Sequence, residues 1–410
     1  KISGWGRKNI VNSKLVNFHN TKEIQTFLNT FNNLSCIPRG LGRSYGDAAQ
    51  LNEDFVLNLD FCNKISLSGN EVNVGGGVSI SRLLEVIIPL GYFLPVSPGS
   101  SKVTIAGAIA ADVHGKNHHK DGSFGNFLKR VLILNSSSEI IEIGPNHPFS
   151  KDEIEMFWAT VGGLGLTGII IEATFSLKKI STSFMKVHTM RCNNIDSMMR
   201  KMIETDEEYE YSVAWIDSLN KNIRGILTCA NHATQNEVKH KKINEKLIYK
   251  TKTSFNIHSF FNFNLINNLS IKLFNELWFR RAHKKNKSEI QTISKFFHPL
   301  DGLQNWNKLY GEKGFYQYQF VVPDESKGLI KKLIKELKQK NIPSFLCVLK
   351  RLGDGNNAML SFPIKGWTLS LDFPSSNPKI LPLLNKYDEL IQKAGGKIYL
   401  AKDARLSPKI

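Results

Sequence analysis

Three glycine-dense segments, residues 38–47, 97–107 and 158–170, limit what this chain can fold into. In the first, Gly40, Gly42 and Gly46 fall within seven residues, so the backbone can approach a ligand closely and point several N–H groups at one anion. The segment matches neither the GxGxxG pattern of a dinucleotide-binding βαβ unit nor a GxxxxGK[ST] phosphate loop. Binding a single phosphate group requires only one such segment, and this chain has three. They predict an extended dinucleotide lying across a domain.

The second glycine segment continues into residues whose small side chains also suit a cofactor. Residues 106–111 are almost entirely alanine and glycine, which leaves room for a flat, bulky group against the backbone. His114, His118 and His119 follow, but their HxxxHH spacing, with Asp112 as the nearest carboxylate, fits no common set of metal ligands. We therefore expect no metal site.

The length of 410 residues predicts two domains. Residues 1–180 show short β-rich runs and one helical spacing at 80–90. From 181 to 374, expected strands alternate with helices such as 326–340, which predicts an α+β or α/β sheet domain. The segment 375–410 carries a predicted helix at 380–394 and a strand at 397–400. The clearest predicted strands are 72–74, 131–135, 168–175, 211–217, 316–323, 345–349 and 367–373.

The net charge of +18 predicts an anionic partner. Residues 235–287 hold twelve Lys and Arg against three Glu, which is half of the excess. Interleaved aromatics suit an anionic lipid headgroup region, but an ordinary solvated loop and helix explains the pattern equally well. Nucleic acid is disfavoured because no recognised motif accompanies the charge. The aromatics are Phe255, Phe260, Phe261, Phe263, Phe274, Trp278 and Phe279.

Cysteine usage and hydropathy indicate a cellular compartment. The five cysteines are widely separated and include no CxxC pair, so a reducing compartment is expected. No apolar run approaches the roughly 20 residues that span a bilayer. We expect a cytoplasmic protein, with peripheral contact at the inner membrane as the alternative. A sequence that opens on Lys1 is also compatible with a removed leader.

Several ordered motifs carry a resemblance to a known family. The segments Arg39-Gly-Leu-Gly-Arg-Ser-Tyr-Gly-Asp47 and Val113-His-Gly-Lys-Asn-His-His119 resemble the FAD domain of the vanillyl-alcohol oxidase superfamily, and within it the decaprenylphosphoryl-ribose 2'-oxidases. The similarity continues through Phe297-His-Pro-Leu-Asp301, Leu360-Ser-Phe-Pro363 and Ala401-Lys-Asp403, so it covers nearly the whole chain. It implies an α+β fold in which a PCMH-type FAD-binding domain (1–180) joins a substrate domain built on an antiparallel sheet (181–374). The C-terminal segment (375–410) would return to the FAD domain.

The resemblance also implies the cofactor and the residues that hold it. Many superfamily members link the flavin to a histidine, and the matching position here is Arg43. Arg43 cannot form that bond and offers a guanidinium to the phosphates instead, so the expected cofactor is non-covalent FAD. The matching FAD-binding positions are Pro38, Arg39, Gly40, Leu41, Gly42, Arg43, Ser44, Tyr45, Gly46, Asp47, Ala48, Gly99, Thr104, Ile105, Ala106, Gly107, Ala111, Asp112, Val113, His114, Ile170 and Tyr399.

Lys402 matches the catalytic lysine of the family. Oxidation of a secondary carbinol needs a base for the hydroxyl proton, and a lysine serves only if burial or a neighbouring cation lowers its pKa. Lys116 and Lys350 match pocket lysines that would supply the cation and bind a substrate phosphate. The remaining matches on the substrate side are His114, Trp215, Phe297, Gln319, Thr368 and Ser370.

Three substrate-side positions depart from the family pattern. Ser370 stands where actinobacterial members carry a cysteine, Thr368 replaces an asparagine, and Phe297 replaces a frequent tyrosine. Serine keeps the size and hydrogen bonding of cysteine but not its thiolate chemistry. Family members also continue beyond the position of Ile410, so a further segment could complete the pocket.

The resulting expectation is an FAD-dependent oxidoreductase that oxidises the 2'-hydroxyl of a polyprenyl-phosphate-linked ribose. A separate NADH-dependent short-chain reductase would reduce the keto sugar and complete a 2'-epimerisation. One alternative is a sugar-lactone or alditol oxidase that acts on a soluble substrate. Another is a membrane- or nucleic-acid-binding protein without turnover. The basic segment 235–287 is further expected to act as a mobile lid that docks on anionic membrane.

Overall fold

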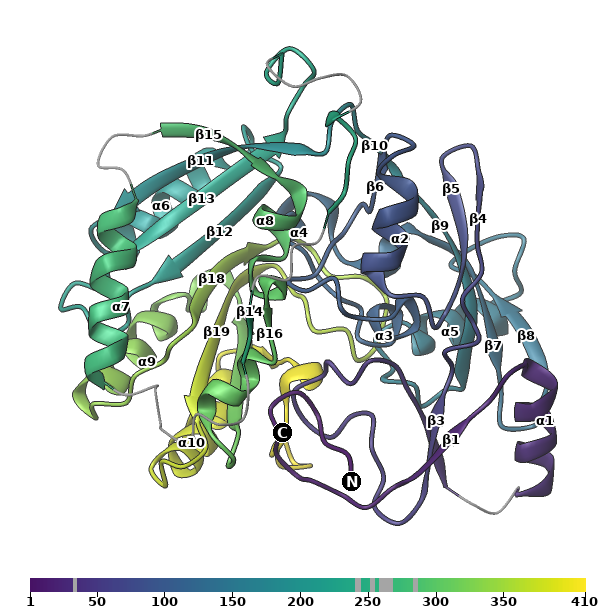
Figure 1. Cartoon of the computed structure of the whole chain (residues 1–410). Helices are drawn as coiled ribbons and strands as arrows, with labels where there is room; N and C mark the ends of the chain where they lie inside the picture. The colour runs from purple at the N-terminus through teal and green to yellow at the C-terminus, as the bar shows by residue number, and fades with distance from the viewer. Residues whose placement is uncertain (32–34, 240–244, 251–254, 258–267, 283–286) are drawn as a thin grey trace.

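The computed structural model describes residues 1–31, 35–239, 245–250, 255–257, 268–282 and 287–410. Figure 1 shows two halves side by side, each built around its own β-sheet, with the two chain ends close together between them. Near these ends, the Asn9 amide donates to the Ala404 carbonyl at 3.0 Å. The first and last parts of the chain therefore lie in one place.

A five-stranded antiparallel sheet with the order β4-β5-β9-β7-β8 forms the centre of the N-terminal half. The strands β1, β3 and β2 form a separate, smaller parallel sheet, and β6 (Tyr92–Phe93) pairs with β10 (Lys178–Lys179). The bounds are β1 (Lys14–Asn17), β2 (Cys36–Arg39), β3 (Phe55–Asn58), β4 (Ile65–Ser68), β5 (Glu71–Gly75), β7 (Leu128–Leu134), β8 (Ile140–Ile143) and β9 (Ile169–Ser176).

Short helices pack against these sheets. In α2 (Ile80–Ile87) the Ser79 side chain caps the first turn, and Leu83 and Leu84 are buried on the inner face. In α3 (Ile105–Ala110) the Thr104 hydroxyl accepts from the Gly107 N–H in the same way. The others are α1 (Thr21–Thr30), α4 (His118–Asp121) and α5 (Lys151–Thr160).

An eight-stranded antiparallel sheet forms the C-terminal half, in the order β15-β11-β13-β12-β18-β19-β17-β20. A short parallel pair, β14 (Phe255–Asn256) with β16 (Leu303–Gln304), lies apart from it. The bounds are β11 (Phe184–Cys192), β12 (Tyr211–Ile216), β13 (Gly225–His232), β15 (Lys287–Thr292), β17 (Phe315–Val322), β18 (Cys347–Leu352), β19 (Gly366–Pro374) and β20 (Lys397–Ile398).

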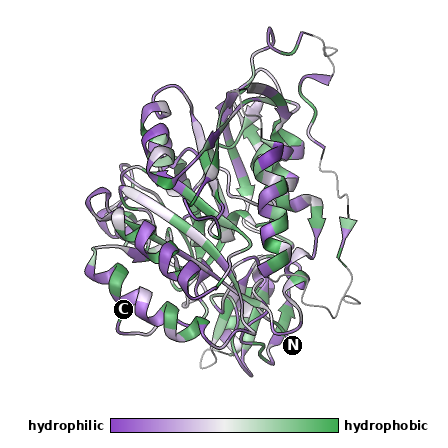
Figure 2. Ribbon diagram, turned by 90° about the vertical axis from the view of Figure 1, so that its left-hand side faces the viewer, coloured by the Kyte–Doolittle hydropathy of each residue, from purple (hydrophilic) through white to green (hydrophobic). Residues whose placement is uncertain are grey.

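Three amphipathic helices cover one face of this sheet. They are α6 (Ile195–Thr205), α9 (Gly328–Gln339) and α10 (Ile380–Lys393), and their apolar residues share one core with the sheet. In Figure 2 these helices show the alternation of hydrophobic and hydrophilic residues that such packing requires. The other two helices are α7 (Asn268–Arg281), at the left edge of Figure 1, and α8 (Ile293–Phe297).

The predicted fold class is confirmed, since the chain is a mixed α and β protein with a large antiparallel sheet in its C-terminal half. The predicted helices at 80–90, 326–340 and 380–394 correspond to α2, α9 and α10. The predicted strand at 397–400 is shorter, because after Ile398 the chain turns into a 3₁₀ turn, η6 (Leu400–Lys402). No helix in the described part of the chain is both long and apolar enough to span a bilayer.

Candidate active site

Three neighbouring strands, β18, β19 and β17, carry polar side chains on the face turned away from the covering helices. Strand residues alternate between the two faces of a sheet. Leu349, Leu369 and Phe320 therefore enter the helix-covered core, whereas Lys350, Ser370 and Gln319 point to the opposite side. The register adds to this, since Gln319 pairs with Ser370 and Lys350 pairs with Thr368.

A cavity of about 550 Å³ lies between this polar face and the glycine-rich loops of the N-terminal half. That volume is within the usual range of cofactor and ligand sites. The residues named so far that line it include Pro38, Arg39, Gly40, Leu41, Gly42, Arg43, Ser44, Tyr45, Ala48, Gly99, Thr104, Ala106, Gly107, Ala111, Val113, His114, Ile170, Gln319, Lys350, Ser370, Tyr399 and Lys402.

Close contacts at glycines shape the cavity wall that is built from the first two glycine segments and from residues 75–77. A Cβ on Gly40 would lie 2.3 Å from the Thr104 hydroxyl, and a Cβ on Gly76 would lie 2.3 Å from the Ile170 carbonyl oxygen. Gly42 has a φ of +61°, in the left-handed region that glycine adopts without strain. A Cβ at any of these positions would collide with neighbouring protein atoms, so glycine lets the segments that line the cavity pack closely. We call the part of the cavity lining that contains Gly40, Gly42 and Gly76 the glycine cradle.

The two arginines of the first loop have different surroundings. Arg39 braces the loop, because its guanidinium donates to the carbonyl oxygens of Ser3 at 2.7 Å and Ala49 at 2.9 Å. The Arg43 guanidinium stacks on the Trp5 ring at 4.0 Å, and its buried Nε has no hydrogen-bond partner among the described residues. A buried donor without a partner is costly. Arg43 thus fits an anionic group such as a cofactor pyrophosphate.

Lys402 reaches the cavity from the η6 turn. Its Nζ lies 3.8 Å from the centroid of the Tyr45 ring. Burial and the nearby Lys350 charge lower the pKa of Lys402 to about 7, although the Asp372 carboxylate acts in the opposite direction. Burial raises the pKa of Asp372 to about 7, against the hydrogen bonds it accepts from Gln317 at 2.7 Å and Tyr310 at 3.3 Å. An amine in this state exchanges protons near neutral pH, as a general base must.

A second chain of polar contacts crosses the cavity beside Lys402. Lys350 Nζ lies 3.1 Å from Nδ1 of His114, and Gln319 Nε2 lies 3.0 Å from Nε2 of the same ring. Burial and the Lys350 charge hold the pKa of His114 well below its usual range, so the ring is neutral. Gln319 also donates to Thr368 at 3.2 Å. A neutral imidazole accepts a hydrogen bond at only one nitrogen and donates at the other. If the Lys350 ammonium donates to Nδ1 of His114, the Nε2–H must donate to Gln319, so the charge on Lys350 and the orientation of the Gln319 amide are linked through this ring.

Comparisons with known proteins decide the family. Residues 13–144 match the model of an FAD binding domain. The chain is 36% identical over 376 residues to the decaprenylphosphoryl-beta-D-ribose oxidase of Mycolicibacterium smegmatis, which covers 90% of this chain and 80% of that protein. The chain belongs to this oxidase family. A protein of Streptomyces coelicolor described as uncharacterized is 28% identical over 343 residues, which covers 81% of this chain and 91% of that protein.

Membership of the decaprenylphosphoryl-ribose oxidase family makes this chain an FAD-linked oxidoreductase. The cavity suits that cofactor, because glycine backbone forms one wall and Arg43 offers a buried cationic donor. Lys402, Lys350, His114 and Gln319 line the same cavity. The cavity therefore combines a glycine-rich lining that suits a flavin with an amine that titrates near neutral pH.

Four of the residues predicted on the substrate side of this oxidase do not line the cavity. Lys116 donates to the Phe296 carbonyl oxygen, and its ammonium lies 4.2 Å from the Phe296 ring centroid. Burial and the Lys350 charge lower its pKa to about 7. Phe297 is buried in an aromatic cluster with Phe93 and Tyr211, and Thr368 lies behind Gln319. Trp215 lies half-buried on β12, next to the β18 strand that carries Lys350.

Four predicted cofactor positions of this oxidase also lie outside the cavity lining: Ile105, Asp112, Gly46 and Asp47. Ile105 is fully buried in the core. Asp112 is fully buried too, and its carboxylate accepts from Ser123, the Gly125 N–H, Asn356 and Ser361 at 2.5–2.9 Å. Asp112 thus ties segments of the chain together. At Gly46 an added Cβ would overlap the Asp403 carbonyl oxygen, so this glycine lets the C-terminal segment pass.

Sequence reasoning missed several residues of the site. Trp5, Gly76, Gly77, Asp301 and Trp306 line the cavity, and Asp372 sits behind it. The Gly75-Gly76-Gly77 cluster after a predicted strand was a usable signal. Trp5 and Asp372 gave none, because their proximity to Arg43 and Lys402 depends on contacts between distant parts of the chain.

Proposed function

We propose that this protein oxidises the 2'-hydroxyl of a polyprenyl-phosphate-linked ribose to the keto sugar. The observation that carries the proposal is the position of Lys402, whose amine, with a pKa of about 7, lines the same cavity as the glycine cradle and Lys350. The Mycolicibacterium smegmatis relative, a decaprenylphosphoryl-beta-D-ribose oxidase by name, supports the choice of sugar.

We further propose that FAD is held without a covalent bond. The residues that would hold it are the glycine cradle, Thr104 and Arg43, with the Tyr399 hydroxyl fixing the end of α3 through a 3.1 Å bond to the Ala111 carbonyl oxygen. Among the described residues that line the cavity, His114 is the only histidine and there is no cysteine. Because His114 Nδ1 contacts Lys350, its ring is engaged on the substrate side.

In the proposed reaction, the cofactor and two lysines of the cavity have separate roles. Bound FAD would supply the acceptor for the hydride that leaves the carbinol carbon. Neutral Lys402 would take the hydroxyl proton at Nζ, so that the carbon–oxygen double bond can form. Lys350, held by His114, would stay protonated to bind the substrate phosphate. It would also disfavour a second positive charge on Lys402.

The proposed product implies a functional partner and a location. A ketone at the 2' position would be reduced by a separate NADH-dependent short-chain reductase, and the pair would invert that carbon. A lipid-linked substrate resides in a membrane, so we propose that the protein works from the cytoplasm at the surface of the inner membrane.

The test is anaerobic reduction of the purified holoenzyme by a short-chain prenylphosphoryl ribose. Bleaching of the flavin absorbance, with a product two mass units lighter, is expected. Free ribose, sugar lactones and alditols at the same concentration should reduce the flavin at least about a hundredfold more slowly, because they lack the phosphate that Lys350 binds. Equal reduction by a soluble polyol would assign the protein to the alditol oxidases instead. Flavin that no sugar reduces would contradict turnover altogether.

A further inference from the structure

Helix α7 buries Ile271 but, unlike the neighbouring α9, exposes most of its large apolar side chains. In α9, Leu333, Ile334 and Leu337 are buried and the lysines face outwards, which is the ordinary arrangement of a surface helix. In α7 the inward positions include Asn275, which donates to Asp217 at 2.8 Å, while Leu273 and Leu277 are both 60% exposed.

The outward face of α7 is a continuous apolar stripe. Leu273 and Leu277 are four residues apart and so lie on the same side of the helix. Phe274 and Trp278 flank them as a stacked pair with ring centroids 5.9 Å apart, 37% and 42% exposed. Figure 2 turns this side of the molecule to the viewer and shows hydrophobic residues along the nearly vertical helix. Single exposed leucines are common on protein surfaces, but a grouped stripe indicates an interaction site.

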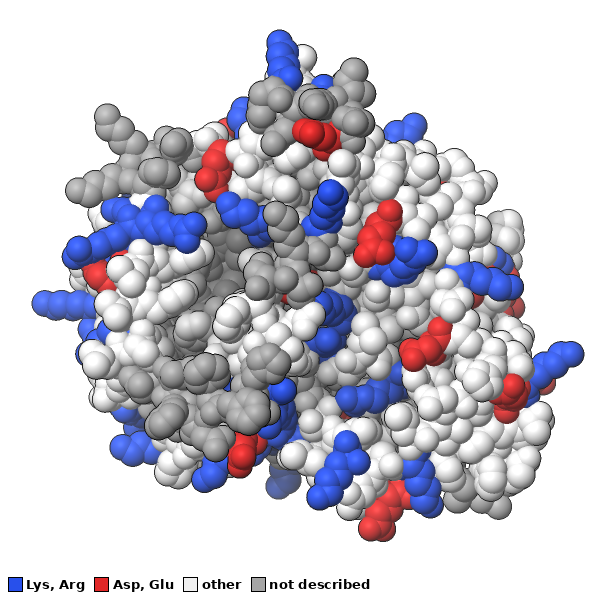
Figure 3. Space-filling view, in the orientation of Figure 1, with Lys and Arg blue, Asp and Glu red and all other residues white. Residues whose placement is uncertain are grey.

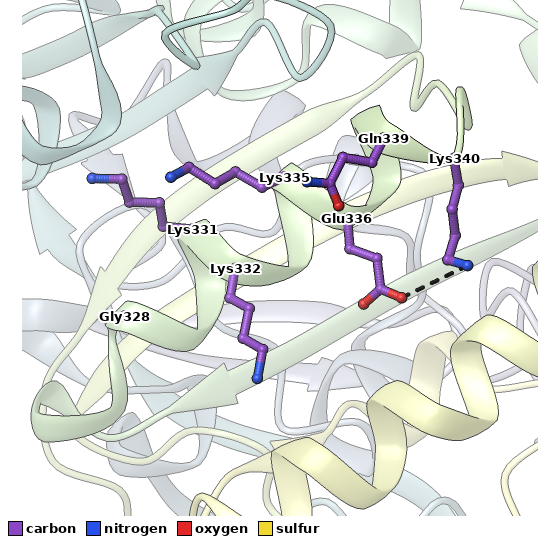
Figure 4. Close-up of a pocket in the computed structure, with 7 residues that line it drawn as sticks. All are labelled: Gly328, Lys331, Lys332, Lys335, Glu336, Gln339 and Lys340. Carbon is purple, nitrogen blue, oxygen red and sulfur yellow. Dashed lines mark ion pairs between the residues drawn. The ribbon is translucent and has the colours of Figure 1, made fainter.

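Positive charge surrounds the stripe. Lys272, Arg280 and Arg281 belong to α7 itself and are exposed. The first residue of α7 contacts the end of α9, since Asn268 Nδ2 lies 3.5 Å from the Asn341 carbonyl oxygen. The exposed face of α9 adds Lys331, Lys332, Lys335 and Lys340, which line a shallow groove in Figure 4. Figure 3 shows Lys and Arg along the left-hand edge, where both helices lie.

Few acidic groups neutralise these cations. Lys331 pairs with Asp196 at 2.5 Å, Lys340 lies 4.0 Å from Glu336, and Arg280 pairs with Glu276 at 2.6 Å. Within the described ranges no ion pair reaches Lys332 or Lys335. The surface therefore presents a narrow apolar stripe beside unneutralised lysines.

We propose that α7 and the lysine face of α9 form a docking surface for an anionic phospholipid membrane. Leucine and tryptophan at the interface with lysine and arginine beside them are the features of helices that lie in the headgroup region. A stable protein partner would need roughly 800 Å² on each side, with few lysines at its centre. One helical stripe with a lysine-rich border does not match that composition.

One part of the docking surface, α7, contacts a residue next to the lining of the catalytic cavity. The Phe274 ring of α7 packs on Phe345 with centroids 5.2 Å apart, and the next residue, Leu346, lines the cavity. The inference deepens the proposed function, but it depends on that function only for the reason to approach a membrane.

The test measures co-sedimentation of the holoenzyme with vesicles of phosphatidylcholine, with and without phosphatidylglycerol. The parent protein should bind the anionic vesicles, and added salt should weaken the binding. Leu273→Gln/Leu277→Gln should reduce the partition coefficient at least about tenfold, and Lys332→Gln/Lys335→Gln should reduce it several-fold on anionic vesicles only. Matched controls are Leu15→Gln/Leu90→Gln, at leucines 52% and 58% exposed in the other half, and Lys22→Gln/Lys129→Gln.

A second measurement locates the contact. Brominated lipids should quench part of the tryptophan fluorescence of the parent protein, and Trp278→Phe should abolish that part. Flavin content and sugar-dependent flavin reduction should be unchanged in all variants, so a failed oxidation assay leaves the vesicle result interpretable. Leucine variants that bind vesicles as the parent does would overturn the proposal. So would a parent protein that is dimeric without lipid and becomes monomeric in the leucine variant, since the stripe would then be a contact between two copies.

Discussion

Lys402 is the side chain that we propose as the base of the reaction. Replacement by alanine should leave FAD bound, because the cradle consists of other residues, but should slow anaerobic flavin reduction by about 10²–10⁴-fold, the usual share of general acid–base catalysis. Stopped-flow absorbance checks this, with Lys409→Ala at an exposed position nearby as the control. A variant that is reduced at the parent rate would show that Lys402 is not the base.

The pH dependence of kcat/KM should reflect two lysines, of which Lys402 acts as the base and Lys350 binds the substrate phosphate. Burial, with the Lys350 charge, lowers the pKa of Lys402 to about 7, so kcat/KM should rise with pH up to about 7 as the base loses its proton. Burial lowers the pKa of Lys350 to about 8, so kcat/KM should fall above about pH 8 as the phosphate loses its cationic partner. The plot of kcat/KM against pH is therefore expected to be bell-shaped. Lys350→Gln should remove the alkaline limb and raise KM, and a profile that keeps this limb would exclude Lys350 as its source.

Ser370 sets how the site responds to reactive ligands. It lines the cavity on β19 opposite Gln319. A serine hydroxyl without a base is a poor nucleophile, so inhibitors that capture the cysteine of related enzymes should leave no adduct here. Ser370→Cys should introduce labelling, which peptide mass mapping would locate. An adduct on Ser370 of the parent protein would contradict the prediction.

At the scale of secondary-structure elements, the turn η3 (Pro299–Gly302) holds the second glycine segment in place. Asp301 accepts from the Ser100 hydroxyl at 2.6 Å and from the Ser101 N–H and hydroxyl at 2.6 and 2.7 Å. The neighbouring His298 ring lies 2.9 Å from the Ser97 hydroxyl. A turn of the C-terminal half thus fixes a glycine-rich segment of the other half, which we expect to contact the cofactor.

Asp301→Ala should therefore weaken FAD binding by about tenfold to a hundredfold, since each hydrogen bond to a charged group contributes about 1.5–3 kcal/mol. Fluorescence titration of the apoprotein with FAD measures the change. Asp354→Ala, at an exposed carboxylate of the loop after β18, is the matched control. Equal FAD affinity in both variants would mean that the loop keeps its shape without η3.

Sequence periodicity predicted the positions of helices and strands better than it predicted which strands lie side by side. Apolar spacing located α2, α9 and α10, because each buries one face of a helix. The strand order could not be read in the same way, since β18 pairs with β12, more than 130 residues earlier. The motif residues that line the cavity were named through the resemblance to a family. Asp112 shows its limit, because a residue of such a motif can serve the scaffold.

At the scale of the whole molecule, we expect unfolding of the protein to release the FAD. Without a covalent link, acid precipitation should release all of the flavin into the supernatant, measured by absorbance. Because FAD would bind the folded state only, added FAD should also raise the melting temperature of the apoprotein. Flavin that stays with the precipitated polypeptide would disprove the non-covalent assignment.

Two domains were predicted from length, and this division stays a prediction. The two largest sheets belong to different core clusters, but the cluster of the N-terminal half also includes Met185, Tyr211 and Phe297 of the other half. Composition could not indicate how these halves meet, because the site is made at their junction from short segments of both. The basic segment 235–287 is a further case. Phe260, Phe261 and Phe263, on which the lid hypothesis depended, lie outside the described residues, so that hypothesis stays a prediction.

The contact between the first loop and the η6 turn has a consequence for biosynthesis. The Tyr45 N–H donates to the Ala401 carbonyl oxygen at 2.9 Å, and Gly46 packs against Asp403. On a translating ribosome, residue 401 is made on the order of 20–70 s after residue 45, at about 5–20 residues per second. During that interval the nascent loop lacks the segment that closes it. Tight cofactor loading is thus a late event in the life of each new chain, and the apoprotein must persist long enough to meet its flavin.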